Sequence, residues 1–152
     1  MVICFVGHSY VSGVDKIETI VREEIRKNIS GLKEIVFYLG FHGSYDYICA
    51  RICQDLKKER PDIQLIYVTP YLTLNEQEKI KDLQKSGLCD TSVYPPIENT
   101  PPKFAISKRN EWMIANSELI IAFVSHRYGG AYSSLQFAKR KKKKIINVFE
   151  LL

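Results

Sequence analysis

Four short polar segments of the chain each follow a short apolar run, and all of them except residues 69–73 concentrate glycine, histidine, serine and tyrosine residues. They are residues 7–13, 40–46, 69–73 and 125–132, and all three histidines of the chain lie in them. Glycine lets backbone N–H groups approach a ligand closely, helix N-termini bind phosphate, and tyrosine rings can stack on a base. The combination predicts a site for a nucleotide or a nucleotide-derived metabolite. For each segment taken alone, a plain turn between a strand and a helix is the alternative.

These segments supply most of the candidate binding residues. The first loop offers phosphate or ribose contacts, the second an anion site at a helix N-terminus, and the fourth a glycine–serine cradle. Asp46 fits either a hydrogen bond to a ribose hydroxyl or a position that favours the helix dipole. Arg109 is the expected charged phosphate ligand, because its planar guanidinium matches phosphate oxygens, with a surface salt bridge as the alternative. The expected ligand-binding residues are Gly7, His8, Ser9, Tyr10, Gly40, Gly43, Ser44, Asp46, Arg109, Gly129, Gly130, Ser133 and Ser134.

Metal and cysteine chemistry receive little support from the spacing. The three histidines have no carboxylate or cysteine partner at metal-ligand spacing, so neither a metal nor another cofactor is expected. Cys4 falls inside an apolar run, and Cys49 and Cys53 share a helical stripe, which predicts buried and unreactive thiols.

The elements that carry these loops follow from the apolar periodicity. Short apolar runs predict five strands, at residues 2–6, 34–39, 63–69, 119–124 and 145–149. Helical stripes fall between them, whereas residues 87–102 are expected to be irregular because two proline pairs interrupt them. The alternation predicts an α/β fold: a Rossmann-like, doubly wound, mostly parallel five-stranded sheet with helices on both faces. Ligands bind beyond the carboxyl ends of the strands in such sheets, and the four polar segments lie there.

The length and the charge of the chain limit the number of domains, the compartment and the partners that can be expected. The 152 residues suit one domain, residues 1–152, and no apolar run is long enough to span a membrane. The N-terminus lacks the features of a signal peptide, so a cytoplasmic protein with free thiols is expected. The net charge is +5, but residues 139–144 hold six of the 22 basic residues. Without this run the chain has 16 basic and 17 acidic residues, so the run is expected to be a solvated helix end and nucleic acid an unlikely partner.

Five segments, in order along the chain, resemble motifs of one protein family. Residues 5–9 (FVGHS) resemble the "FTGHR" opening of one branch of the SLOG superfamily, and residues 40–46 (GFHGSYD) its second motif. Residues 108–113 (KRNEWM) are similar to its "RN-x-W-M" segment, and residues 116–122 and 129–131 to the strand and glycine turn that follow. The resemblance implies a Rossmann-like domain, related to Lonely-guy and DprA-type domains, that binds nucleotides or ligands derived from them.

One branch of that superfamily, the Lonely-guy-type phosphoribohydrolases, cleaves the N-glycosidic bond of nucleoside monophosphates. Arg109 and Met113 match its Arg-x-x-x-Met segment, and Gly129 and Gly130 match its later glycine pair. Gln136, however, stands where that branch has its glutamate. An amide supplies no negative charge to an oxocarbenium-like transition state, so the resemblance weighs against this enzyme activity, and no catalytic residue is assigned.

The leading hypothesis is therefore a sensor or sequestering protein. It would bind an NAD- or ADP-ribose-like signal or a cyclic nucleotide without turnover, as SLOG proteins do in bacterial defence and counter-defence, as a homodimer or higher homo-oligomer. The alternative is an N-glycosidase or related nucleotide hydrolase that uses Arg109 with Asp46 or Glu111. A third interpretation is a nucleic-acid protein that uses residues 139–144 and loses affinity steeply with salt.

Overall fold

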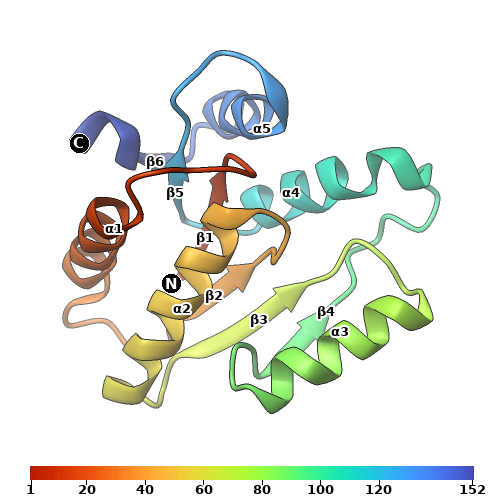
Figure 1. Cartoon of the computed structure of the whole chain (residues 1–152), viewed down its shortest axis with the longest axis horizontal. Coiled ribbons are helices and arrows are strands. Elements are labelled where there is room, and N and C mark those ends of the chain that lie inside the picture. The colour runs from red at the N-terminus through yellow and green to blue at the C-terminus, as the bar shows by residue number, and fades with distance from the viewer.

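The computed structural model describes residues 1–152, and six parallel strands form one sheet with helices on both of its faces (Figure 1). The strands are β1 (Val2–Gly7), β2 (Val36–Leu39), β3 (Gln64–Val68), β4 (Thr91–Val93), β5 (Leu119–Phe123) and β6 (Lys144–Asn147). The α-helices are α1 (Val14–Ile29), α2 (Ser44–Glu59), α3 (Leu74–Lys85), α4 (Ala105–Ala115) and α5 (Gly129–Arg140). Two short 3-10 helices, η1 (Pro102–Phe104) and η2 (Val148–Leu151), complete the chain.

The strand order is β4-β3-β2-β1-β5-β6, so the chain moves outward in one direction from β1 and then crosses back to β5. Cys4 of β1 pairs with Tyr38 of β2 on one side and with Ile120 of β5 on the other. The loops after β1 and β5 therefore leave the sheet at its carboxyl edge in diverging directions. This is the topological switch point, where open α/β sheets bind ligands. The prediction of a Rossmann-like, doubly wound fold is confirmed.

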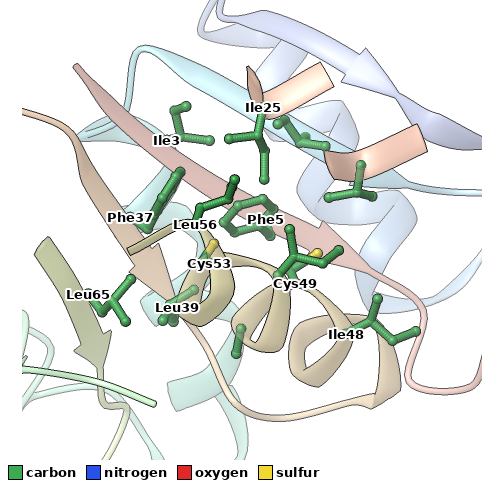
Figure 2. Close-up of a cluster of buried hydrophobic side chains, with 14 of the residues drawn as sticks. Ile3, Phe5, Ile25, Phe37, Leu39, Ile48, Cys49, Cys53, Leu56 and Leu65 are labelled. Atoms are coloured by element: carbon green, nitrogen blue, oxygen red, sulfur yellow. The ribbon is translucent and has the colours of Figure 1, made fainter. Parts of the chain in front are cut away.

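The core lies on both faces of the sheet. Helices α1 and α2 lie side by side, with α2 over β1 and β2 and α1 next to η2 (Figure 1), and Figure 2 shows Phe5 and Phe37 of the sheet pointing at Cys49 and Leu56 of α2. The opposite face is covered by α4 and α5, which bury a smaller apolar cluster. Every residue of β5 is buried, as expected for a central parallel strand.

Helix α1 shows why the periodic segments were predictable. Ile17, Val21, Ile25 and Ile29 recur every four residues, and all four are buried against the sheet. Asp15 lies in the first turn and basic residues lie in the last, as the helix dipole favours. Gly31 follows with a φ of +74°, a left-handed conformation that ends a helix and suits glycine.

The prediction of five strands is wrong, because β4 adds a sixth within residues 87–102. Thr91–Val93 pairs with β3 in parallel register before the first proline pair begins, and Val93 O accepts a hydrogen bond from Thr69 N at 2.9 Å. Asp90 anchors the start of this strand, because Asp90 Oδ2 accepts a bond from Leu65 N at 2.8 Å. The last strand is also shorter than predicted, since β6 ends at Asn147 and a 3-10 helix follows.

None of the helices is both long enough and apolar enough to pass through a bilayer.

Candidate functional site

The largest cavity of the chain opens at the carboxyl ends of β1 and β5 and has a volume of about 620 Å³. Its walls come from the end of β1 and the following loop, the N-terminus of α2, one face of η1 and α4, and the start of α5. The lining residues are Phe5, Val6, Gly7, His8, Ser9, Tyr10, His42, Gly43, Asp46, Lys103, Ile106, Ser107, Asn110, His126, Tyr128, Gly129, Gly130, Ala131 and Ser134. The cavity thus occupies the switch point of the sheet.

The loop after β1 is fastened to the N-terminus of α2. Ser44 N donates to Ser9 O at 2.9 Å, and Val11 N donates to Ser44 Oγ at 3.0 Å. Gly43 makes this approach possible, because a Cβ there would lie 2.6 Å from Ser9 Cα. Ser44 therefore holds the loop in place and does not line the cavity.

Asp46 occupies the anion site that the sequence placed at the start of α2. Its Oδ2 accepts hydrogen bonds from His42 N at 3.0 Å and Gly43 N at 3.3 Å. Burial raises the pKa of the Asp46 carboxyl, while the Arg109 guanidinium and these two N–H groups act to lower it. With these donors and Ser44 N already engaged, the α2 N-terminus does not offer the expected anion contacts from Gly43 and Ser44. Asp46 lies in the first turn of α2, where a negative charge favours the helix dipole, and its geometry matches this second interpretation.

Arg109 does not line the cavity, contrary to its expected role as a phosphate ligand. Its side chain is only 1% exposed, and Nη1 donates to Gly40 O at 3.0 Å and to Val68 O at 2.7 Å. Nε donates to Asn110 Oδ1 at 2.8 Å. The guanidinium thus joins α4 to the carboxyl ends of β2 and β3, where backbone carbonyls accept from Nη1. Gly40, packed against Arg109 and Asp46, does not line the cavity either.

Three aromatic rings form a continuous stack on the β5 side of the cavity. The ring centroids of His8 and His126 are 3.8 Å apart, and those of His126 and Tyr128 are also 3.8 Å apart. His8 is buried, whereas Tyr128 is 70% exposed. The stack therefore runs from the core to the surface. Tyr10, which is 83% exposed, lines the same cavity.

His8 is held as a neutral acceptor at the base of this stack. Its Nε2 accepts a hydrogen bond from Ser125 N at 2.9 Å, and its backbone N donates to Phe123 O at 3.3 Å. Acceptance at Nε2 places the proton on Nδ1. Burial, and secondarily the neighbouring His126, lower the pKa of His8.

This lowered pKa predicts a loss of stability in mild acid. Above the unfolded-state pKa of about 6.5, His8 is neutral in both states and its full contribution is present. As the pH falls from that value toward the lower folded-state pKa, the unfolded chain takes up the proton first and stability declines. Urea unfolding at about pH 7.5 and pH 5 should show this decline in the wild type. A smaller decline is expected in His8→Gln, and equal declines in both proteins would contradict the assignment.

The N-terminus of α5 is open, unlike that of α2. No side chain caps it, and a Cβ at Gly129 or Gly130 would meet no atom within 4 Å. Gly129 has a φ of +87°, which turns the chain from the extended Tyr128 into the helix. Lys103 stands on the η1 side of the cavity, so the cavity combines free helix N–H groups with a cation.

Nine of the thirteen expected residues line this one cavity: Gly7, His8, Ser9, Tyr10, Gly43, Asp46, Gly129, Gly130 and Ser134. Gly40, Ser44 and Arg109 have the structural places described above, and Ser133 lies exposed on the outer side of α5. Direct contact of these residues with a ligand remains a prediction.

The sequence reasoning missed the wall formed by η1 and α4. Lys103, Ile106, Ser107 and Asn110 recur at spacings of three or four residues, so they share one helical face. That spacing was the available signal, but the apolar and charged residues of this helix do not separate into two clear faces. His126 and Tyr128 were within a predicted loop but were not among the expected ligand-binding residues.

The basic run at residues 139–144 lies at the opposite edge of the sheet, because it joins the C-terminus of α5 to the N-terminus of β6. Lys143 Nζ donates to Ala115 O at 3.0 Å and Lys144 Nζ donates to Asn28 Oδ1 at 3.0 Å. These two lysines thus secure neighbouring helices, while residues 139–142 are exposed.

Comparisons with known proteins identify the fold. No protein-family model and no curated protein sequence matches the chain. The structure of DNA processing protein A (DprA) from Streptococcus pneumoniae is similar, with a TM-score of 0.62 and 16% identity over 94% of this chain and 48% of that one. A structure of DprA from Helicobacter pylori has a TM-score of 0.60 and 19% identity over 95% of this chain and 63% of that one. The chain thus spans about half of one neighbour and less than two thirds of the other, and shares their Rossmann-like fold.

These neighbours contradict the expected ligand. The Helicobacter pylori structure is described as giving insights into the single-stranded DNA binding mode of that DprA. This finding runs against a small-molecule partner and against nucleic acid as an unlikely partner. It points away from both the sensor or sequestering interpretation and the N-glycosidase alternative, and both are withdrawn. The homodimer or higher homo-oligomer, which was expected as part of the small-molecule interpretation, is withdrawn with it.

Proposed function

We propose that this chain binds single-stranded DNA at the carboxyl edge of its sheet. The observation that carries the proposal is the stack of His8, His126 and Tyr128, which ends in an exposed ring at the mouth of a polar cavity. Proteins that bind single strands combine aromatic platforms, on which bases stack, with positive charge that follows the backbone. The described single-stranded DNA binding of a similarly folded DprA supports the same ligand class.

The stack suits a base better than a lone surface tyrosine does. Tyr128 is supported from behind by His126, which is supported in turn by the buried His8. A base placed on the outer face of Tyr128 would extend an existing ladder of rings, and Tyr10 offers a second exposed ring in the same cavity. The phenol ring is large and apolar, which favours stacking without selecting one base.

Phosphates have a separate place in the cavity. The uncapped N-terminus of α5 presents backbone N–H groups beside Gly129 and Gly130, and Lys103 adds a positive charge. Asp46 is the one carboxylate of the lining, and its Oδ2 accepts two backbone hydrogen bonds. We therefore expect the strand backbone to approach the α5 side of the cavity rather than the α2 side.

Replacing Tyr128 tests the proposal. Stacking on an aromatic ring contributes about 1–3 kcal/mol per base, so Tyr128→Ala should weaken binding of labelled oligothymidylate roughly 5- to 150-fold. Tyr128→Phe keeps the ring and should bind like the wild type. Fluorescence anisotropy at about 50 mM salt measures both affinities.

Leu74→Ala is the matched control, since Leu74 is 79% exposed on α3 and lies outside the cavity. It should leave the affinity unchanged. Equal affinities of the wild type and Tyr128→Ala would remove the stack from the binding site. Failure of the wild type to bind at low salt would reject the function.

The family of the chain is a separate proposal. The order of the segments at residues 5–9, 40–46, 108–113, 116–122 and 129–131 supports a place in the SLOG superfamily, beside the DprA-type domains. We also propose that residues 1–152 fold as one domain, because the two apolar clusters share a single sheet.

A further inference from the structure

We propose that a single strand held at the cavity continues along the outer face of α5 to a basic cluster formed by Lys139, Arg140, Lys141 and Lys142. This inference rests on the proposed function and extends it by assigning a second contact at the far edge of the sheet. Helix α5 connects the two places, because it begins at the cavity with Gly129 and ends at Arg140. Its 12 residues span about 18 Å.

The outer face of α5 carries no charge that would repel a strand. Gly129, Ser133, Gln136 and Arg140 recur at spacings of three or four residues and so form one row along the helix. Ser133 is exposed, and Gln136 is half-buried. Hydroxyl and amide groups in this row can donate hydrogen bonds to phosphate oxygens.

The surrounding chain is free of acidic residues. From Leu119 to Phe149 there is no aspartate or glutamate, whereas the same stretch holds seven arginine and lysine residues. The rest of the chain then has 15 basic and 17 acidic residues, a net charge of −2. The whole positive balance of the protein therefore lies on β5, α5, β6 and the loops that join them. Glu150, which lines a small cavity with Lys139, is the first carboxylate beyond this stretch.

The basic cluster is available to a ligand. Lysines elsewhere on the surface pair with carboxylates, such as Lys57 with Asp90 and Lys108 with Glu111. No ion pair of the chain includes a residue of the basic cluster. These four cations are therefore free to neutralise phosphates.

Phe137 places an aromatic ring inside the cluster. The Arg140 guanidinium lies 5.9 Å from the centre of the Phe137 ring, and Lys141 Nζ lies 5.5 Å from it. The far end of α5 thus combines an aromatic ring with positive charge, and the cavity at its near end is likewise lined by Tyr128 and Lys103. That combination is the one that single-strand binding surfaces use.

The length of the path sets the expected footprint. A strand that keeps the stacked spacing of a duplex, about 3.4 Å per phosphate along its axis, would place about five nucleotides along these 18 Å beyond those in the cavity. An oligothymidylate of about 4 nucleotides can fill the cavity alone, whereas one of about 12 nucleotides can reach both ends of α5. The longer oligomer should bind more tightly and with a steeper salt dependence.

The test compares these two oligomers on the full chain, by fluorescence anisotropy over a series of salt concentrations. The test variant, called the α5 variant, combines Lys139→Gln, Arg140→Gln and Lys141→Gln. The matched control, Lys33→Gln, Arg51→Gln and Lys85→Gln together, removes the same charge from exposed residues in no ion pair of the structure. Circular dichroism verifies that both variants fold.

We expect the α5 variant to bind the longer oligomer roughly 10- to 100-fold more weakly than the wild type. The slope of log affinity against log salt should fall by about 2, because each of the three lost phosphate contacts contributes about 0.7 to that slope. Its affinity for the short oligomer should stay within about twofold of the wild type, and the control variant should do little to either.

Three outcomes would overturn the inference while leaving the proposed function standing. They are equal affinities of the two oligomers for the wild type, equal losses on both oligomers in the α5 variant, and a control variant as weak as the α5 variant. If neither oligomer binds the wild type at low salt, the proposed function fails together with the inference.

Discussion

Arg109→Ala is expected to lower the free energy of unfolding by about 3–5 kcal/mol, because it removes one charge from a buried network and leaves the others without compensation. Arg109 is 1% exposed, and its guanidinium donates to the carbonyls of Gly40 and Val68. The substitution leaves both carbonyls without this donor and Asp46 without the cation that counteracts its burial. Urea denaturation at neutral pH measures the loss.

Arg26→Ala is the control for this prediction. Arg26 pairs with Glu59 at 2.8 Å, but both side chains are more than half exposed. Exposed pairs contribute about 0–1 kcal/mol, so this variant should differ little from the wild type. Arg109→Lys keeps the charge but loses the planar fork of donors. Its free energy of unfolding should therefore lie between those of Arg109→Ala and Arg26→Ala. A loss below about 1 kcal/mol for Arg109→Ala would contradict the network described above.

Gly7→Ala is expected to be the second most damaging substitution, with a loss of at least about 3 kcal/mol of stability, at the upper end of overpacking costs. A Cβ at this position would lie 2.8 Å from Tyr45 Cβ and would overlap the Tyr45 ring. That ring cannot move away cheaply, because Tyr45 is fully buried and its hydroxyl donates to Ile121 O at 3.1 Å. Thermal or urea unfolding measures the change.

Gly130→Ala is the matched control for Gly7→Ala. A Cβ at Gly130 meets no atom within 4 Å, and the residue lies in the first turn of α5. Alanine favours helix more than glycine does, so this variant should be as stable as the wild type or slightly more stable. Equal stability of Gly7→Ala and Gly130→Ala would show that β1 and α2 do not pack as closely as described.

The sequence predicted elements whose apolar residues follow a regular spacing. Helix α1 and strand β5 are examples, because every fourth residue of one and every residue of the other is buried. Strand β4 was missed because its three residues are too few for a period, and its pairing depends on β3, which lies more than twenty residues earlier. Only the tertiary fold could reveal that strand.

The candidate site was predictable to the extent that it lies in strand-end loops. Gly7 ends β1 and Gly129 follows the loop after β5, and the parallel topology brings those strand ends together. Arg109 shows the limit: its residue type suits phosphate, but burial decides its partners, and burial depends on how α4 packs against β2 and β3. Asp46 likewise has a residue type that suits a ligand contact, but its Oδ2 accepts hydrogen bonds from His42 N and Gly43 N.

The fastening of residues 7–13 to α2 has a consequence for the kinetics of binding. Hydrogen bonds from Ser44 N and Val11 N hold this loop against the helix, so a ligand would meet a wall that is already ordered. Little conformational entropy of the protein would then be lost on association, and the ordering cost would fall on the flexible strand. Association should therefore proceed without a slow loop rearrangement, and variants of the cavity should differ mainly in dissociation rate and residence time.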